Sequence, residues 1–270
     1  MLTGNQPEAK KSLGQHWLHD IDVLEDIAGC ADITNDDTVL EIGPGLGTLT
    51  RVLVKKAKQV VAVEFDEILA GRLPQEVPVS NLEVITQDIL SLDFTKLPFD
   101  YKLVANIPYY LTSNLIRVIS ETPNPPSVAV LLVQKEVAER VAAAPGSTSI
   151  LSITAQFFWE VSLGNIVPAE LFTPPPKVDS QILILDRRPK SNLSDADIKK
   201  FFQLVKAGFS QRRKTLLNSL SGGLGLSKQV IKEKCELAGI DPSRRAQTLT
   251  MVEWNKLYSV IPAQAGNQTN

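Results

Sequence analysis

Residues 38–50, TVLEIGPGLGTLT, predict the strand and turn around which a parallel sheet is built. The apolar run 38–43 is typical of a buried strand, and LTRVLVKKA at 49–57 has the apolar spacing of a helix. Between them, Gly43 and Gly45 permit positive φ angles and a close backbone approach. The N-terminus of the following helix offers free N–H groups to a ligand. The stretch therefore predicts the first strand, turn and helix of an α/β fold with a ligand at the turn.

The same alternation extends on both sides of this stretch. We expect further strands, rich in apolar residues, at 59–65, 81–88, 101–108 and 127–134. Helical patterns precede or separate them at 20–31, 67–77, 113–121 and 135–144. Strands joined through helices at this spacing pair in parallel, with helices on both faces of the sheet. The sequence thus predicts a doubly wound α/β fold.

The pattern changes in the second half of the chain. A helix is expected at 147–158, and strands at 160–168 and 178–188 are joined by the proline-rich loop AELFTPPPK. Strands that follow one another this closely are expected to form an antiparallel hairpin at one end of the sheet. The polar stretch RRPKSNLSDA marks a boundary, and helical patterns follow it. We therefore predict two domains, at 1–188 and 189–270, the second of them small and all-helical.

The composition favours a cytoplasmic protein that has no membrane span and binds no metal. The 270 residues, 43% of them hydrophobic, suffice for a full core, and no apolar run reaches the length of a membrane span. The start, MLTGNQPEAKK, lacks the hydrophobic region of a secretory signal. Cys30 and Cys235 are too few for a disulfide framework or a zinc site, and His16 and His19 have no third metal ligand nearby.

Opposite charges are segregated along the chain, although the formal net charge is only −2. Residues 1–186 carry 13 basic and 24 acidic side chains, a net charge of −11. Residues 187–270 carry 15 basic and 6 acidic side chains, a net charge of +9. A basic segment of this size favours contact with a polyanion such as a nucleic acid. A helical tail with solvated Lys side chains is the alternative interpretation.

Acidic side chains stand at the ends of the second and third predicted strands. Glu64 follows Gly43 by 21 residues, where a carboxylate can accept hydrogen bonds from both hydroxyls of a ribose. Asp88 is placed to bind an adenine amino group. Because the carboxyl ends of parallel strands meet at one edge of the sheet, we expect a nucleoside pocket there. The glycine spacing G-x-G-x-G disfavours NAD, and Pro44 lacks the N–H that a pyrophosphate would use.

The fourth strand ends in NIPY, residues 106–109. The side-chain carbonyl of Asn106 and the backbone carbonyl of Ile107 can each accept one N–H of an exocyclic adenine amine. Held in this way, the nitrogen is drawn toward tetrahedral geometry, with its lone pair aimed at an electrophilic methyl group. Pro108 keeps the turn rigid, and Tyr109 can stack on the base. The alternative is a plain strand-to-helix turn with tyrosines in the core.

These motifs together resemble the ribosomal RNA adenine dimethyltransferase family. The resemblance covers nearly the whole chain and rests on eight stretches: KKSLGQHWLHD, VLEIGPGLGTLT, VVAVEFD, QDIL, VANIPYY, LLVQKEVAERVAA, LFTPPPKVDS and FSQRRKTLLNSL. It implies a seven-stranded, Rossmann-like class I methyltransferase sheet, mostly parallel with one antiparallel strand. The expected domains are then a catalytic domain at 1–188 that binds S-adenosylmethionine and a basic RNA-binding domain at 189–270.

The resemblance also implies roles for particular residues. The cofactor site would comprise His16, Leu18, Gly43, Gly45, Glu64, Asp88 and Asn106. The catalytic residues would be Asn106, Pro108, Tyr109 and Phe172, the last as a second aromatic ring beside the target adenine. Phe172 could instead anchor its loop in the core. Where this chain has His16 and Trp17, many family members have Asn and Phe.

The implied activity is dimethylation of N6 of two adjacent adenosines near the 3′ end of small-subunit rRNA. The implied partner is small-subunit rRNA within an immature small ribosomal subunit, bound by a monomer. Arg212, Arg213 and Lys214 are the densest basic cluster available to grip phosphates. Alternatives are a large-subunit rRNA adenine methyltransferase of the antibiotic-resistance type, a largely non-catalytic assembly factor, and an NAD-dependent oxidoreductase, for which no catalytic Tyr-x-x-x-Lys or His constellation is present.

Overall fold

The computed structural model describes residues 14–108 and 111–261. The chain divides into two compact units, which are described separately below. The first unit comprises Met1–Ala138 and Glu160–Arg187, and the second comprises Glu139–Trp159 and Arg188–Asn270. The chain passes between the units after residues 138, 159 and 187, and the boundary predicted near residue 188 lies at the last of these points. Residues 139–159, predicted in the first domain, group with the helical unit. The assignment of a catalytic and an RNA-binding role to these parts stays a prediction.

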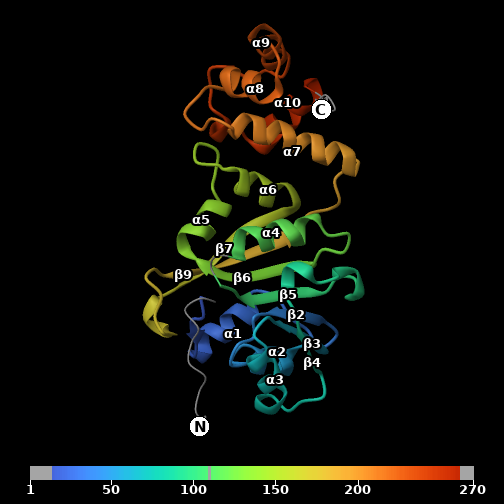
Figure 1. Ribbon diagram of the computed structural model, residues 1–270, viewed down its shortest axis with the longest axis vertical. Coiled ribbons are helices and arrows are strands. Elements are labelled where there is room, and N and C mark those ends of the chain that lie inside the picture. The colour runs from blue at the N-terminus through green and yellow to red at the C-terminus, as the bar shows by residue number, and fades with distance from the viewer. Residues whose placement is uncertain (1–13, 109–110, 262–270) are drawn as a thin grey trace. The chain divides into compact units, whose positions relative to one another are not determined.

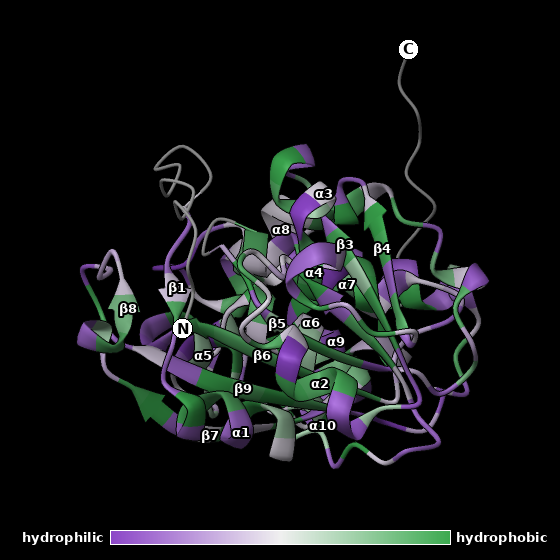
Figure 2. Ribbon diagram, turned by 90° about the horizontal axis from the view of Figure 1, so that it is seen from below, coloured by the Kyte–Doolittle hydropathy of each residue, from purple (hydrophilic) through white to green (hydrophobic). Residues whose placement is uncertain are grey.

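The first unit is built on a seven-stranded sheet with the order β4-β3-β2-β5-β6-β9-β7 (Figure 1). Its strands are β2 (Thr38–Ile42), β3 (Gln59–Glu64), β4 (Leu82–Thr86), β5 (Lys102–Asn106), β6 (Val128–Gln134), β7 (Trp159–Val167) and β9 (Ser180–Arg187). Neighbouring strands pair in parallel from β4 through β3, β2 and β5 to β6, and β9 pairs antiparallel with β6. The strands are hydrophobic along most of their length (Figure 2) because helices cover both faces. The doubly wound α/β prediction is confirmed.

Helices of the first unit alternate with these strands. They are α1 (Ile21–Gly29), α2 (Thr50–Lys56), α3 (Glu67–Glu76), α4 (Thr112–Glu121) and the first part of α5 (Lys135–Val141). One core cluster joins α1 and α2 to the sheet through residues such as Leu24, Leu53 and Val104. Asp20 and Asp66 begin α1 and α3 by accepting backbone N–H bonds, as their position before each helical pattern suggests. No helix among the described residues is long and apolar enough to cross a membrane.

A second, two-stranded sheet joins distant segments of the first unit. Strand β1 (Trp17–Leu18) pairs antiparallel with β8 (Phe172–Thr173), so that Leu18 lies opposite Phe172. Both of these side chains belong to the core cluster. No sequence pattern predicts this pairing, because a two-residue strand is too short to show an alternation of apolar and polar residues.

The second unit is helical. It contains α6 (Ile150–Phe158), α7 (Asp195–Phe209), α8 (Leu216–Leu224), α9 (Lys228–Leu237) and α10 (Met251–Val260). Their core includes Ile153, Phe201, Leu220 and Trp254. Because Ile153 of α6 packs in this core, a chain cut near residue 188 would leave α6 without its partners.

The turn after β2 requires a glycine at position 47, and a substitution there tests this requirement. This glycine has φ +73°, and a Cβ there would lie 2.7 Å from Cδ1 of buried Leu73. Gly47→Ala is expected to lower the free energy of unfolding by about 1–3 kcal/mol. Gly71→Ala in α3 is the matched control, because a Cβ there meets nothing within 4 Å. Helix propensity should make that variant slightly more stable, and equal effects in denaturant titrations would contradict the argument.

Candidate nucleoside site at the carboxyl edge of the sheet

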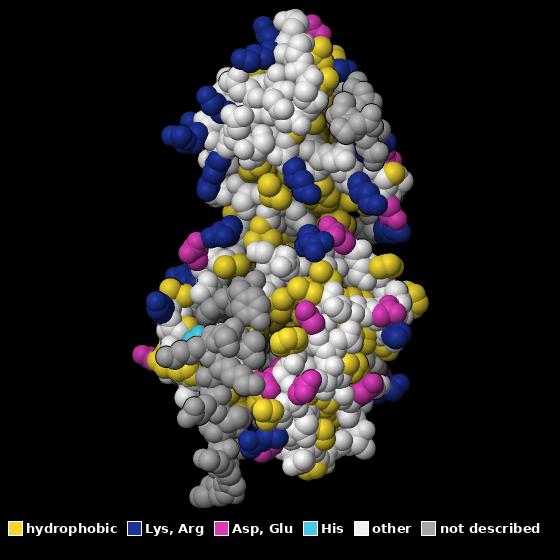
Figure 3. Space-filling model, in the orientation of Figure 1, with side chains coloured by type: hydrophobic (Ala, Val, Ile, Leu, Met, Phe, Trp, Pro, Cys, Tyr) yellow, Lys and Arg dark blue, Asp and Glu magenta, His cyan; other side chains and the backbone are white. Residues whose placement is uncertain are grey.

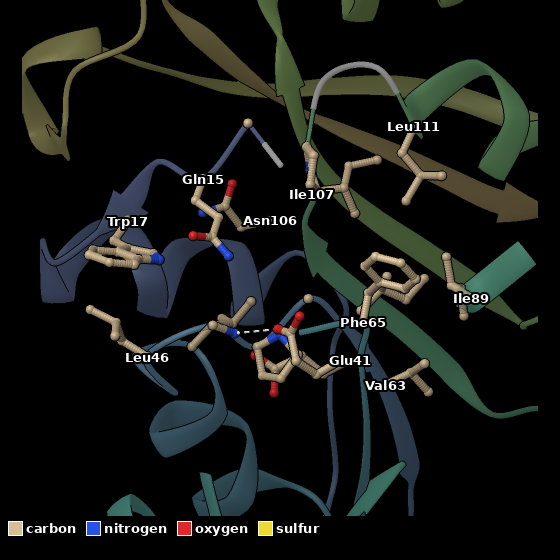
Figure 4. Close-up of a pocket in the computed structure, with 18 of the residues that line it drawn as sticks. Gln15, Trp17, Glu41, Leu46, Val63, Phe65, Ile89, Asn106, Ile107 and Leu111 are labelled. Carbon is tan, nitrogen blue, oxygen red and sulfur yellow. Dashed lines mark hydrogen bonds between the residues drawn. The ribbon is translucent and has the colours of Figure 1, made fainter. Parts of the chain in front are cut away.

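A cavity of about 190 Å³ lies at the carboxyl ends of β2, β3, β4 and β5 (Figure 4). The parallel register fixes its walls, because Ile42 of β2 pairs with Val63 of β3 and with Ala105 of β5. The residues that follow these positions therefore emerge side by side. The cavity is lined by eight of the residues predicted from the sequence: His16, Leu18, Gly43, Gly45, Glu64, Asp88, Asn106 and Pro108.

The glycine turn forms the floor of the cavity. Gly43 and Gly45 have φ values of +65° and +57°, which side chains rarely adopt. Gly43 N–H donates to the Val63 carbonyl at 2.9 Å, and Gly45 N–H donates to Glu64 Oε2 at 3.1 Å. The turn is thus held against β3 by its own backbone, in the conformation that the glycines were expected to provide.

Glu64 is buried at the end of β3, with 6% of its surface exposed. Its Oε1 accepts the N–H of Asp66 at 2.9 Å, and its Oε2 accepts that of Gly45. Burial raises the pKa of Glu64, and hydrogen bonds from the backbone N–H groups of Asp66, Gly45 and Phe65 oppose the rise. A carboxylate has about four acceptor positions, so a ribose hydroxyl could still donate to Glu64.

Asp88 and Asn106 complete the polar wall. Asp88 is exposed, and its Oδ1 accepts the Leu90 N–H at 2.9 Å. Asn106 ends β5, and its Nδ2 donates to the His16 carbonyl at 3.4 Å. The amide is therefore oriented with its nitrogen toward the N-terminal segment, and its oxygen has no hydrogen-bond partner among the described residues. An acceptor in this place suits an N–H donor such as an adenine amine.

Two predicted catalytic residues are not among the residues that line the cavity, for different reasons. Tyr109 lies outside the described residues. Phe172 is 3% exposed, packs in the core cluster and does not line the cavity. This placement agrees with the alternative, in which Phe172 anchors its loop in the core.

His16 connects the cavity to the proline-rich loop. Its Nδ1 lies 2.6 Å from the Pro174 carbonyl, next to the β1–β8 pairing. His16, predicted to contact the cofactor, therefore also helps to hold the segment 14–18 along one side of the cavity.

The sequence interpretation missed Glu41. This carboxyl in the middle of β2 is 1% exposed, lines the cavity and has no hydrogen-bond partner for either oxygen. Burial raises the pKa of Glu41 to about 8; the nearby Thr50 hydroxyl opposes the rise, and the neighbouring Glu64 adds to it. The sequence feature that could have indicated Glu41 is an ionisable residue inside an otherwise apolar strand. The cavity thus carries three carboxyl groups, and there is no Lys or Arg among the described residues that line it.

The comparisons with known proteins agree with this geometry. A model of the family described as ribosomal RNA adenine dimethylase matches residues 6–261. Ribosomal RNA small subunit methyltransferase A of Dehalococcoides mccartyi (strain CBDB1) is 44% identical over 264 residues, covering 95% of this chain and 90% of the relative.

Two crystal structures also resemble the chain. A dimethyladenosine transferase from Plasmodium falciparum has a TM-score of 0.78 at 30% identity, with 92% of this chain and 98% of that chain covered. The 23S rRNA methyltransferase ErmE has a TM-score of 0.75 at 28% identity, with 91% and 99% covered.

The buried Glu41 makes a prediction about stability and pH. The folded protein keeps a proton on Glu41 up to a pKa of about 8, whereas the unfolded chain releases it near 4.5. The free energy of unfolding should therefore fall as the pH rises between these values, by an amount on the order of a few kcal/mol. In Glu41→Gln this fall should be absent, so the variant gains stability relative to the parent from pH 5 to pH 8. Urea titrations at several pH values measure this, and parallel curves for both proteins would show that Glu41 is ionised in the fold.

Proposed function

The chain belongs to the ribosomal RNA adenine dimethylase family, and from that premise we propose that it dimethylates N6 of two adjacent adenosines near the 3′ end of small-subunit rRNA. The methyl donor would be S-adenosylmethionine. The substrate would be an immature small ribosomal subunit in the cytoplasm, bound by a monomer, so that the protein also takes part in subunit biogenesis.

The observation that carries this proposal is the position of Asn106 in the cavity. The amide stands at the end of β5, on the same sheet edge as Glu64 and Asp88. One cavity therefore combines candidate binding groups for a nucleoside with an acceptor for the amine of a second one. Such an arrangement suits methyl transfer to an adenine amine better than it suits simple RNA binding.

The residues of the cavity fit S-adenosylmethionine. Glu64 would hold the ribose, Asp88 the adenine amine, and Gly43 and Gly45 would lie beside the amino-acid portion. The carboxylates of Glu64 and Asp88 suit a ligand with a cationic sulfonium and ammonium and would repel a pyrophosphate, and Glu41, protonated in the free protein, can ionise when a cation binds beside it. When bound, the cofactor supplies a methyl group activated by the positive sulfur.

The chain's own residues would act by orientation and polarisation. Asn106 Oδ1 and the Ile107 carbonyl accept the two N–H groups of the target amine, which directs the nitrogen lone pair toward the methyl group. Once the nitrogen has gained a methyl group, its positive charge makes the remaining protons acidic, and one of them is released to water. A monomethylated amine still has one N–H to donate, so the same acceptors can orient it for the second transfer.

The second unit would bind the RNA backbone. Figure 3 shows many Lys and Arg side chains on the visible face of this unit. Arg212, Arg213 and Lys214 are exposed in the loop before α8, and none of them forms an ion pair within the described part of the chain. Arg244, by contrast, is paired with Glu253 and also donates to the Thr248 carbonyl. The exposed Arg245 is near the basic loop, because Leu216 N–H donates to the Arg244 carbonyl at 2.7 Å.

The target adenosine has to be unpaired or extruded to reach the cavity. A large-subunit target is the alternative, supported by the similarity to ErmE, but the relative at 44% identity has a small-subunit name. Mass spectrometry of rRNA from immature small and large subunits, after incubation with the protein and labelled S-adenosylmethionine, distinguishes them. We expect N6,N6-dimethyladenosine in small-subunit rRNA. Label in large-subunit rRNA alone, or in neither, would contradict the proposal.

The NIPY turn predicts a separation of catalysis from RNA binding. Asn106→Ala and Tyr109→Ala should reduce the rate of methyl transfer far more than the affinity for RNA, because the Asn106 amide orients the target amine and the Tyr109 ring stacks on the base. Tyr109→Phe should keep much of the activity, since base stacking, worth about 1–3 kcal/mol, needs the ring. Asn114→Ala, at an exposed position of α4, is the control. Equal inactivity of Tyr109→Phe and Tyr109→Ala would assign the role to the hydroxyl instead.

The basic loop predicts a change in salt dependence. Replacement of Arg212, Arg213 and Lys214 by Gln should weaken binding to immature small subunits and leave cofactor affinity unchanged. Each lost phosphate contact should flatten the slope of log affinity against log salt by about 0.7–0.9. The charge-matched control replaces the exposed Lys55, Lys58 and Lys96 of the first unit by Gln. If both triple variants have the same slope in filter-binding titrations, the loop is ordinary solvated surface.

A further inference from the structure

The indole of Trp17 has a buried N–H without a hydrogen-bond partner. The ring forms part of the cavity wall, and its nitrogen is turned toward the interior of the cavity (Figure 4). The indole edge lies over Gly45, because a Cβ on that glycine would be 3.5 Å from Nε1 and 3.5 Å from Cδ1. Leaving a buried donor unpaired is unfavourable, so a partner for this N–H is expected from whatever the cavity binds.

The charges of the cavity specify what kind of partner is needed. Glu41, Glu64 and Asp88 are acidic, and the described lining residues include no Lys or Arg. Cationic groups of a ligand therefore have carboxylates to meet. An anionic group has no cation to meet among these residues and depends on neutral N–H donors.

Most backbone donors of the glycine turn are already used. Gly43 N–H donates to the Val63 carbonyl, Gly45 N–H to Glu64, and Gly47 N–H to the Pro44 carbonyl at 2.8 Å. Pro44 has no N–H to offer. The indole N–H of Trp17 is a side-chain donor beside this turn that has no acceptor among the described residues, and the backbone N–H groups of Leu46 and Thr48 are also without an acceptor there.

We propose that Trp17 Nε1–H donates a hydrogen bond to the α-carboxylate of the cofactor's amino-acid portion and so makes the site selective for a ligand that carries this carboxylate. The inference rests on the proposed function, because it takes S-adenosylmethionine as the ligand. Trp17 acts here as a binding and specificity residue. A hydrogen bond from a neutral donor to a charged acceptor in a buried site is strong enough to produce such selectivity.

Trp17→Phe tests the proposal, since Phe keeps an aromatic ring and removes the N–H. The probes are S-adenosylmethionine and decarboxylated S-adenosylmethionine, which share the sulfonium and the ammonium. Calorimetry should show about a ten- to hundredfold loss of affinity for the first ligand in the variant. Affinity for the decarboxylated ligand should stay within about twofold of the parent value. A thermal unfolding curve like that of the parent serves as the folding control.

An NMR measurement on the parent protein keeps the test independent of the variant. The chain has three tryptophans, so a sample labelled with ¹⁵N-tryptophan should give three indole N–H signals. Trp159 and Trp254 are fully buried and do not line the cavity. One signal should move downfield with S-adenosylmethionine and much less with the decarboxylated ligand.

The outcomes separate the inference from the proposed function. If the parent binds neither ligand, the cofactor assignment itself is wrong. If the parent binds S-adenosylmethionine but Trp17→Phe loses affinity for both ligands equally, the ring acts through packing and the inference is overturned. An unchanged affinity in the variant, or no carboxylate-dependent indole shift, overturns it as well.

Discussion

The parallel pairing of β3, β2 and β5 is the constraint on which the site depends. Parallel strands present all their carboxyl ends at one edge, and the register aligns Ile42 with Val63 and Ala105. Gly43, Glu64 and Asn106 directly follow these three residues. They converge although they are separated by 63 residues of sequence at most. The backbone bond from Gly43 to Val63 then fixes the turn against β3, so the cavity floor belongs to the sheet itself.

The cost of this arrangement is electrostatic. Glu41 and Glu64 are both buried at the same edge, and burial raises the pKa of each. Burying these carboxyl groups is unfavourable for their ionised forms, and a cation bound beside them would favour ionisation and offset part of that cost. The same acidity leaves an anionic ligand group dependent on neutral donors such as the indole of Trp17. The buried carboxyl groups of this unit thus lower its stability and also determine which charged groups of a ligand the cavity can accept.

The segment 14–18 gives the cavity a wall that the sheet does not provide. It is held by the β1–β8 pairing, by His16 against the Pro174 carbonyl and by Asn106 against the His16 carbonyl. Phe172 contributes to this support from the core. Residues that line the cavity and residues of the proline-rich loop are therefore parts of one small structure.

The sequence by itself determined the doubly wound sheet, the helical character of the C-terminal part and most of the cavity wall, because strand and helix periodicity are local and parallel strands bring their ends together. It placed Gly43, Glu64, Asp88 and Asn106 correctly at one edge. Only the tertiary structure decided that Phe172 is buried, that Arg244 is bound by Glu253 while Arg245 is exposed, and that residues 139–159 join the helical unit. It also revealed the β1–β8 pairing and the unpartnered groups of Glu41 and Trp17. These features depend on which side chains fill the space between distant segments, and no local pattern records that.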